Sequence, residues 1–224
     1  MDEVLSQSEI DSLLKAVTSG KLDTEKAKKT KGNREEITRY DFKRPNKYSK
    51  DQLRTLQLIH DNFCRVLSNF LSAYLRAEVR TKIASVDQTT YEDFIVSMSA
   101  PTLITMFKIK PKDEAALMVT NSGFLFPIID LVFGGTGEVD DAQRELTDIE
   151  INVMRKLNKK ILDHLANAWD NVYPISPEIE SLETTPQFSQ LYSPTETVAV
   201  VTISTEVEGQ ESLINICLPY IALE

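Results

Sequence analysis

Apolar residues recur at alternating spacings of three and four along one segment, which predicts a buried face on a helix of about 25 residues. The positions are Leu53, Leu56, His60, Phe63, Leu67, Phe70 and Tyr74. The start is marked by Ser49 as a cap, Gln52 as the third residue of a capping box, and a Tyr48–Leu53 hydrophobic staple. We interpret His60 as a hydrogen-bonded core residue, because it lies on the apolar face.

A second long helix is predicted after a capping box formed by Thr147 and Glu150, with a staple around them. Its expected buried stripe is Ile149, Val153, Leu157, Ile161, Leu165 and Trp169. His164 lies off this stripe, so we expect it to be exposed to solvent.

Three strand-like runs follow each helix. They span residues 78–86, 102–109 and 115–120 in the first half, with a hairpin turn at 110–114, and residues 178–184, 197–206 and 212–218 in the second. The segments 85–102 and 181–195 also resemble each other, which indicates an internal duplication. The predicted fold class is α+β: a pseudo-twofold pair of helix-then-three-strand units, with halves at about 48–137 and 146–224.

Between the halves lies an apolar segment that runs into a glycine-rich loop. Proline is favoured in the first turn of a helix and glycine just after the last, so we predict a short helix that begins at Pro127 and is stopped at Gly134. Gly134, Gly135 and Gly137 are three of only seven glycines in the chain. This position between the halves makes the loop a candidate contact surface.

The chain begins with a helix signal on a polar tail. Ser6 and Glu9 form a capping box with a Leu5–Ile10 staple, and residues 1–20 are expected to contain one short amphipathic helix. Residues 21–47 are polar and basic, which predicts a flexible linker. Such a helix either docks in the groove of a partner, the reading we favour, or folds back locally.

Charge and cysteine content narrow the possible functions. The net charge of −9 is uneven, because the tail is slightly basic and the body strongly acidic; this argues against a nucleic-acid surface on the body. Cys64 and Cys217 have no CxxC partner, and the sequence has no secretory leader or long apolar span. We therefore expect a cytoplasmic location without membrane insertion.

The sequence offers little for catalysis. The glycine loop lacks the lysine of a phosphate-binding loop and the spacing of a dinucleotide fingerprint. Two histidines and two cysteines at scattered positions do not predict a zinc site, and no GxSxG motif is present. We expect no catalytic residue, metal or cofactor, and a protein that is not an enzyme.

Two segments carry a resemblance to a known family. The N-terminal run closely resembles the response-regulator-binding segment of the FliM family of flagellar motor switch proteins, and the run Phe133 to Gly137 resembles the GGxG loop of that family's middle domain. The resemblance covers nearly the whole chain and implies a CheC-like fold for residues 48–224. The family usually carries a further FliN-like domain, and we expect the natural chain to continue into it, because the repeat would start another helix at Tyr220.

The resemblance also implies partners and a place in the cell. The family forms the switch ring (C-ring) on the cytoplasmic face of the inner membrane and controls the direction of flagellar rotation in chemotaxis. Phosphorylated CheY would bind Leu5, Ser6, Gln7, Ser8, Glu9, Ile10, Asp11, Leu13 and Leu14. FliG would bind Phe133, Gly134, Gly135, Thr136 and Gly137. Neighbouring FliM subunits would pack side by side, and FliN would join through the C-terminal domain.

Two alternatives remain open. The CheC and FliY phosphatases share the fold, and they carry an acidic residue three positions before an Asn on each long helix. None of the ten Asn in this chain has an acidic residue at that position, so the sequence resembles the non-catalytic branch. In the second alternative the chain is an adaptor whose glycine loop only terminates a helix.

Overall fold

The computed structural model describes residues 47–139, 144–185 and 191–223, and its six strands form one antiparallel sheet. The elements in chain order are α3 (Lys50–Leu75), β1 (Val79–Thr90), α4 (Tyr91–Val96), β2 (Thr102–Lys110), β3 (Glu114–Asn121), α5 (Ser122–Val132), α6 (Asp148–Trp169), β4 (Ser176–Glu183), β5 (Thr197–Val207), β6 (Gln210–Pro219) and α7 (Tyr220–Leu223).

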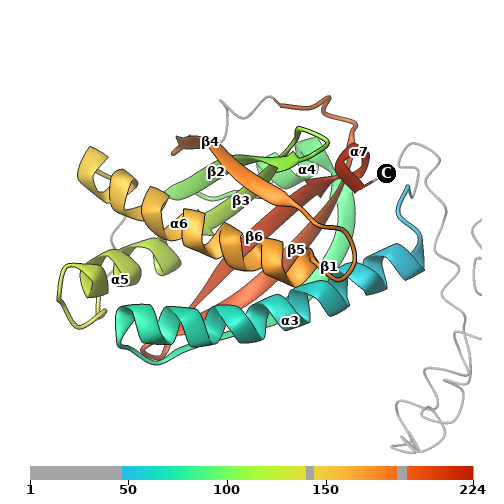
Figure 1. Ribbon diagram of the computed structural model, residues 1–224. Coiled ribbons are helices and arrows are strands. Elements are labelled where there is room, and N and C mark those ends of the chain that lie inside the picture. Colours follow the sequence, from blue (N-terminus) through green and yellow to red (C-terminus); the bar gives the residue numbers. More distant parts are fainter. Residues whose placement is uncertain (1–46, 140–143, 186–190, 224) are drawn as a thin grey trace, which may run out of the picture. The chain divides into compact units, whose positions relative to one another are not determined.

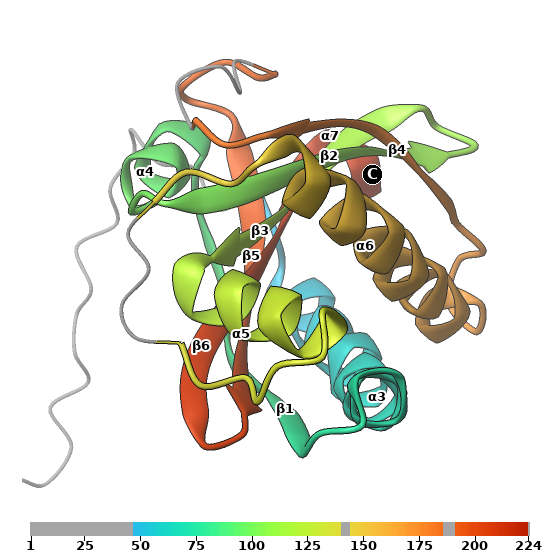
Figure 2. The same ribbon diagram turned by 90° about the vertical axis from the view of Figure 1, so that its left-hand side faces the viewer.

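Helices cover both faces of the sheet, because its central strands are apolar on both sides. Along β3, Met118 packs into the core beneath α3, α5 and α6, whereas Leu117 packs with Tyr91 and Phe94 of α4 on the opposite face. Alternate side chains of a strand point to opposite faces, which explains this division. Figures 1 and 2 show α3, α5 and α6 together on one side of the sheet.

The strand order β1-β5-β6-β3-β2-β4 confirms the predicted duplication and adds a feature that the sequence did not predict. The first strand of each half pairs with the hairpin of the other half, so β1 pairs with β5 and β4 with β2. The register of each edge strand also shifts at an equivalent place, between Ile83 and Ser85 in β1 and between Ile179 and Ser181 in β4. The two halves are therefore interlocked in one sheet.

The long helices match each other residue by residue. Both predicted capping boxes are present, at Ser49 with Gln52 and at Thr147 with Glu150. Alignment of the two boxes places the buried residues Leu56, Ile59, His60, Phe63 and Leu67 of α3 opposite Met154, Leu157, Asn158, Ile161 and Leu165 of α6. His60 is fully buried, as predicted for a core residue.

The predicted stripes were wrong near the helix ends. Tyr74 is 39% exposed and Leu71 and Leu75 are buried instead, while Ile149 in the first turn of α6 is 70% exposed. A spacing of three and four averages 3.5 residues, so the buried face of a 3.6-residue helix drifts by about 20° per seven residues. His164 is half-buried rather than exposed, because its ring lies 4.6 Å from that of Phe70 on α3.

The helix before the glycine loop begins earlier than predicted. α5 starts at Ser122, because the Asn121 side chain accepts a hydrogen bond from the backbone N–H of Phe124. Pro127 therefore lies inside the helix, where it removes one backbone hydrogen bond. The sequence reading also missed α4, a helix of six residues capped by the Thr90 side chain.

Candidate functional site

The candidate contact loop begins where α5 ends, and its first two glycines close the helix. Gly134, at φ +93°, donates its N–H to the Leu131 carbonyl, and Gly135 donates to the Asp130 carbonyl at 2.8 Å. This pair of bonds is a Schellman motif, which satisfies carbonyls that a helix end otherwise leaves unpaired. The positive φ explains glycine at position 134.

The side chain of Asp130 makes a further hydrogen bond to the same loop. The Asp130 carboxylate accepts a hydrogen bond from the Gly137 N–H at 2.9 Å. A Cβ atom at position 135 would lie only 2.1 Å from an oxygen of that carboxylate, so Gly135 leaves room for it. Gly137 has φ +81° and lies against Leu131, where a Cβ would come within 3.1 Å of the side chain. Asp130 thus contacts the loop at both Gly135 and Gly137.

The loop presents an aromatic side chain to solvent. Phe133 is 60% exposed, Gly134, Gly135 and Thr136 are also exposed, and Gly137 is buried. Four of the five residues predicted as the FliG contact are therefore exposed, and the fifth, Gly137, is buried. An exposed aromatic residue held by an ordered loop is suited to insertion into a pocket of a protein partner.

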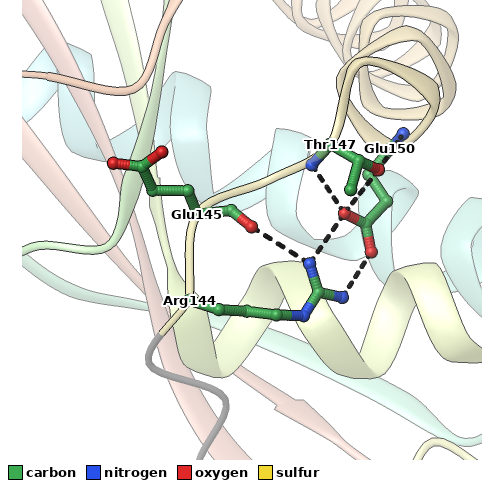
Figure 3. Close-up of polar contacts among 4 residues, drawn as sticks. All are labelled: Arg144, Glu145, Thr147 and Glu150. Carbon is green, nitrogen blue, oxygen red and sulfur yellow. Dashed lines mark hydrogen bonds and ion pairs between the residues drawn. The ribbon is translucent and has the colours of Figure 1, made fainter.

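Beyond the loop, an ion pair fastens the chain to α6 (Figure 3). Arg144 donates two hydrogen bonds to the Glu150 carboxylate, one of them at 2.9 Å, and a third to the Glu145 carbonyl. Glu150 also accepts from the backbone N–H and the hydroxyl of Thr147. The Arg144 guanidinium lies 4.8 Å from the ring centroid of Phe126 on α5. The cluster thus ties the start of α6 to α5.

Stability is expected to depend on pH through this cluster. The hydrogen bonds from Arg144, then those from Thr147, lower the pKa of Glu150 from its ordinary value of 4.5 to about 2, although burial opposes them. The stabilisation is therefore present above pH 4.5 and is lost as the pH falls toward 2. We expect Glu150→Gln to lower the free energy of unfolding by about 1–3 kcal/mol at about pH 7.

Urea unfolding of the wild type and Glu150→Gln at about pH 7 and about pH 3 measures this effect. The difference between the two proteins should shrink at the lower pH. Glu145→Gln is the control, because only its backbone carbonyl joins the cluster. An equal difference at both pH values would contradict the assignment.

The sequence reading did not find Asp130 or Arg144. The available signals were an acidic residue four positions before Gly134 and an arginine six positions before the glutamate of a capping box. Neither pattern is specific without the three-dimensional contacts. The predicted CheY-binding residues 5–14 lie outside the described part of the chain.

The buried histidine and the two buried cysteines are uncharged at pH 7. Burial lowers the pKa of His60 to about 4, and its Nδ1 lies 2.8 Å from the Leu56 carbonyl, so the ring is neutral at pH 7. Burial also raises the pKa of the Cys64 and Cys217 thiols. Within residues 47–139, 144–185 and 191–223, no three His, Cys, Asp or Glu side chains are grouped to hold a metal.

A separate apolar cavity of about 430 Å³ lies away from the loop. Its walls include Leu56 of α3, Leu165 and Trp169 of α6, Leu218 of β6 and Ala222 of α7. α7 follows β6 as α5 follows β3, and Ala222 and Leu223 of α7 line the cavity. No residue of the glycine loop lines it.

Comparisons with known proteins agree with this architecture. The family model described as "Flagellar motor switch protein FliM" matches residues 49–224. FliM of Treponema pallidum is 44% identical over 224 residues, which are the whole of this chain and 65% of that protein, so the chain spans just under two thirds of its length.

Solved structures share the fold. A chain of the FliG–FliM complex from H. pylori matches with a TM-score of 0.75 and 32% identity, over 78% of this chain and 96% of that one. FliY of Thermotoga maritima matches with a TM-score of 0.70 at 16% identity, over 79% of this chain and 93% of that one, which shows a common fold alone. Because the family model covers most of the sequence, the chain belongs to the FliM family of flagellar motor switch proteins.

Proposed function

We propose that this switch protein binds FliG through the loop from Phe133 to Gly137. The observation that carries the proposal is the 60% exposed Phe133 side chain on a loop that Asp130 holds by hydrogen bonds at Gly135 and Gly137. The likeness to a chain of the H. pylori FliG–FliM complex supports the choice of partner. Calorimetric titration of the chain with the middle domain of FliG tests it, and the absence of binding would refute it.

Phosphorylated CheY is the second partner in this proposal, captured by residues 5–14. The support is the capping box and staple at Ser6 and Glu9, followed by apolar anchors at Ile10, Leu13 and Leu14. A polar linker after this segment raises the local concentration of captured CheY near the body. A CheY-dependent shift in how the body holds FliG would then bias the direction of rotation.

Deletion of residues 1–20 separates these two activities. The shortened chain should lose binding of phosphorylated CheY and retain the wild-type affinity for FliG, because the FliG loop lies in a folded body that begins after the linker. Titrations of both proteins with each partner measure this. If FliG binding also disappeared while the body stayed folded, the modular arrangement would be wrong.

The proposed location is the C-ring at the cytoplasmic face of the inner membrane, beside other FliM subunits and with FliN as a further neighbour. In the described residues, no helix combines the length and the apolar character needed to cross a bilayer.

A CheY phosphatase of the CheC or FliY type is the alternative function. Asn158 is buried and its amide donates to Thr105 at 2.8 Å, so it cannot orient an external water. The other four Asn of α3 and α6 are exposed, but none of them follows an acidic residue by three positions, so these helices lack the acid–Asn pair of those phosphatases. Release of phosphate from phosphorylated CheY on addition of this chain would favour the alternative. We expect no release above the spontaneous rate.

A further inference from the structure

We propose that Asp130 is the positioning residue of the partner-binding loop and that its carboxylate is the reason for glycine at position 135. The inference rests on the proposed FliG contact and goes beyond it. It divides the loop into residues that meet the partner, Phe133 and Thr136, and residues that hold these two in place.

Asp130 holds the loop through two groups. Its backbone carbonyl accepts the Gly135 N–H at 2.8 Å, and its carboxylate accepts the Gly137 N–H at 2.9 Å. The chain from position 131 to 137 is therefore closed on a single residue of α5. Neither bond uses the Phe133 or Thr136 side chain, and both residues are exposed, although the Thr136 hydroxyl accepts a hydrogen bond from the Glu138 N–H at 3.4 Å.

Position 135 requires glycine because of the Asp130 side chain, and not because of its own backbone conformation. Its φ lies outside the left-handed region, in contrast to Gly134 and Gly137. The three nearest atoms to a Cβ at this position all belong to the Asp130 carboxyl group, at 2.1–2.3 Å. A methyl group here would thus displace the carboxylate and break its bond to Gly137.

An ordered loop lowers the entropic cost of binding. Asp130→Ala should weaken FliG binding about tenfold and speed exchange of the Gly137 amide by at least about tenfold, because the amide loses its acceptor. Asp130→Asn keeps an acceptor oxygen and should stay within about threefold of the wild-type affinity. Glu211→Ala is the control for loss of one exposed carboxylate, and it should bind as the wild type does.

A double-mutant cycle gives the sharper test. Gly135→Ala alone should weaken binding about tenfold, since its methyl group collides with the carboxylate. In the Asp130→Ala background the collision partner is gone, so the double variant should bind within about twofold of Asp130→Ala alone. Gly134→Ala should not be rescued in this way, because its constraint is the positive φ.

Titration calorimetry with FliG, amide exchange and thermal unfolding are measured on each variant of the chain from residue 1 to residue 224. Additive losses in the cycle, or wild-type FliG affinity in Asp130→Ala, would overturn the inference. Unchanged exchange at Gly137 in Asp130→Ala would overturn it as well, whatever the outcome with FliG. Failure of the wild type to bind FliG would instead refute the proposed function, while the exchange data would still decide whether Asp130 holds the loop.

Discussion

Phe133→Asp is expected to reduce the affinity for FliG by at least about 100-fold, the largest effect on function that we predict. Central aromatic residues dominate many protein interfaces, because they bury a large apolar area at a small entropic cost. A carboxylate at this position would lose that area and would carry an unpaired charge into the interface. Phe133 is 60% exposed in the free protein, so the fold should tolerate the change.

Titration of FliG into the wild type and the variant measures the loss, and the thermal midpoint checks the fold. Val96→Asp is the matched control: Val96 is 77% exposed at the end of α4, on the opposite face of the sheet from α5. It should leave the affinity unchanged. Wild-type affinity in Phe133→Asp, with the protein folded, would show that the glycine loop only terminates α5.

Phe63→Ala should lower the free energy of unfolding by about 3–5 kcal/mol, the largest effect on stability. Phe63 is fully buried in α3 and meets the ring of His60 edge to face, at 6.2 Å between centroids. Its removal would leave a cavity between α3 and the sheet, and close-packed surroundings collapse only in part. A loss of this size approaches the whole stability of an ordinary domain.

Urea unfolding measures the change through the transition midpoint. Leu58→Ala on the same helix is the control, because Leu58 is 65% exposed and should change the stability by no more than about 0.5 kcal/mol. Equal effects of the two substitutions would mean that the buried face of α3 is assigned wrongly. FliG binding by the folded fraction of Phe63→Ala should be preserved, since Phe63 lies outside the glycine loop.

Local signals in the sequence determined most of the secondary structure. The capping boxes at Ser49 and Thr147 each fix a helix start through contacts within four residues, so no tertiary information is needed. The duplication was visible too, because the order of helix and strands repeats. The glycine loop was predicted as a candidate contact surface because it lies between the two halves.

Tertiary contacts decided which residues near the helix ends are buried and which strands pair. Which residues of α3 and α6 are buried near their ends depends on how the helices cross the sheet, and Ile149 was misassigned for that reason. The pairing of β1 with β5 joins residues that are more than a hundred positions apart, and no local pattern encodes such a partner.

In the candidate site, too, some features follow from the sequence and others only from the tertiary structure. The sequence by itself determined that an aromatic residue and three glycines follow an apolar helix, because glycine and proline restrict the backbone locally. Only the tertiary structure decided that the Asp130 carboxylate folds back to Gly137 and that Arg144 reaches Glu150 beside Phe126. Both contacts join residues that come close only after the chain has folded. The packing of the loop against its helix brings them together, and the residue types alone do not predict it.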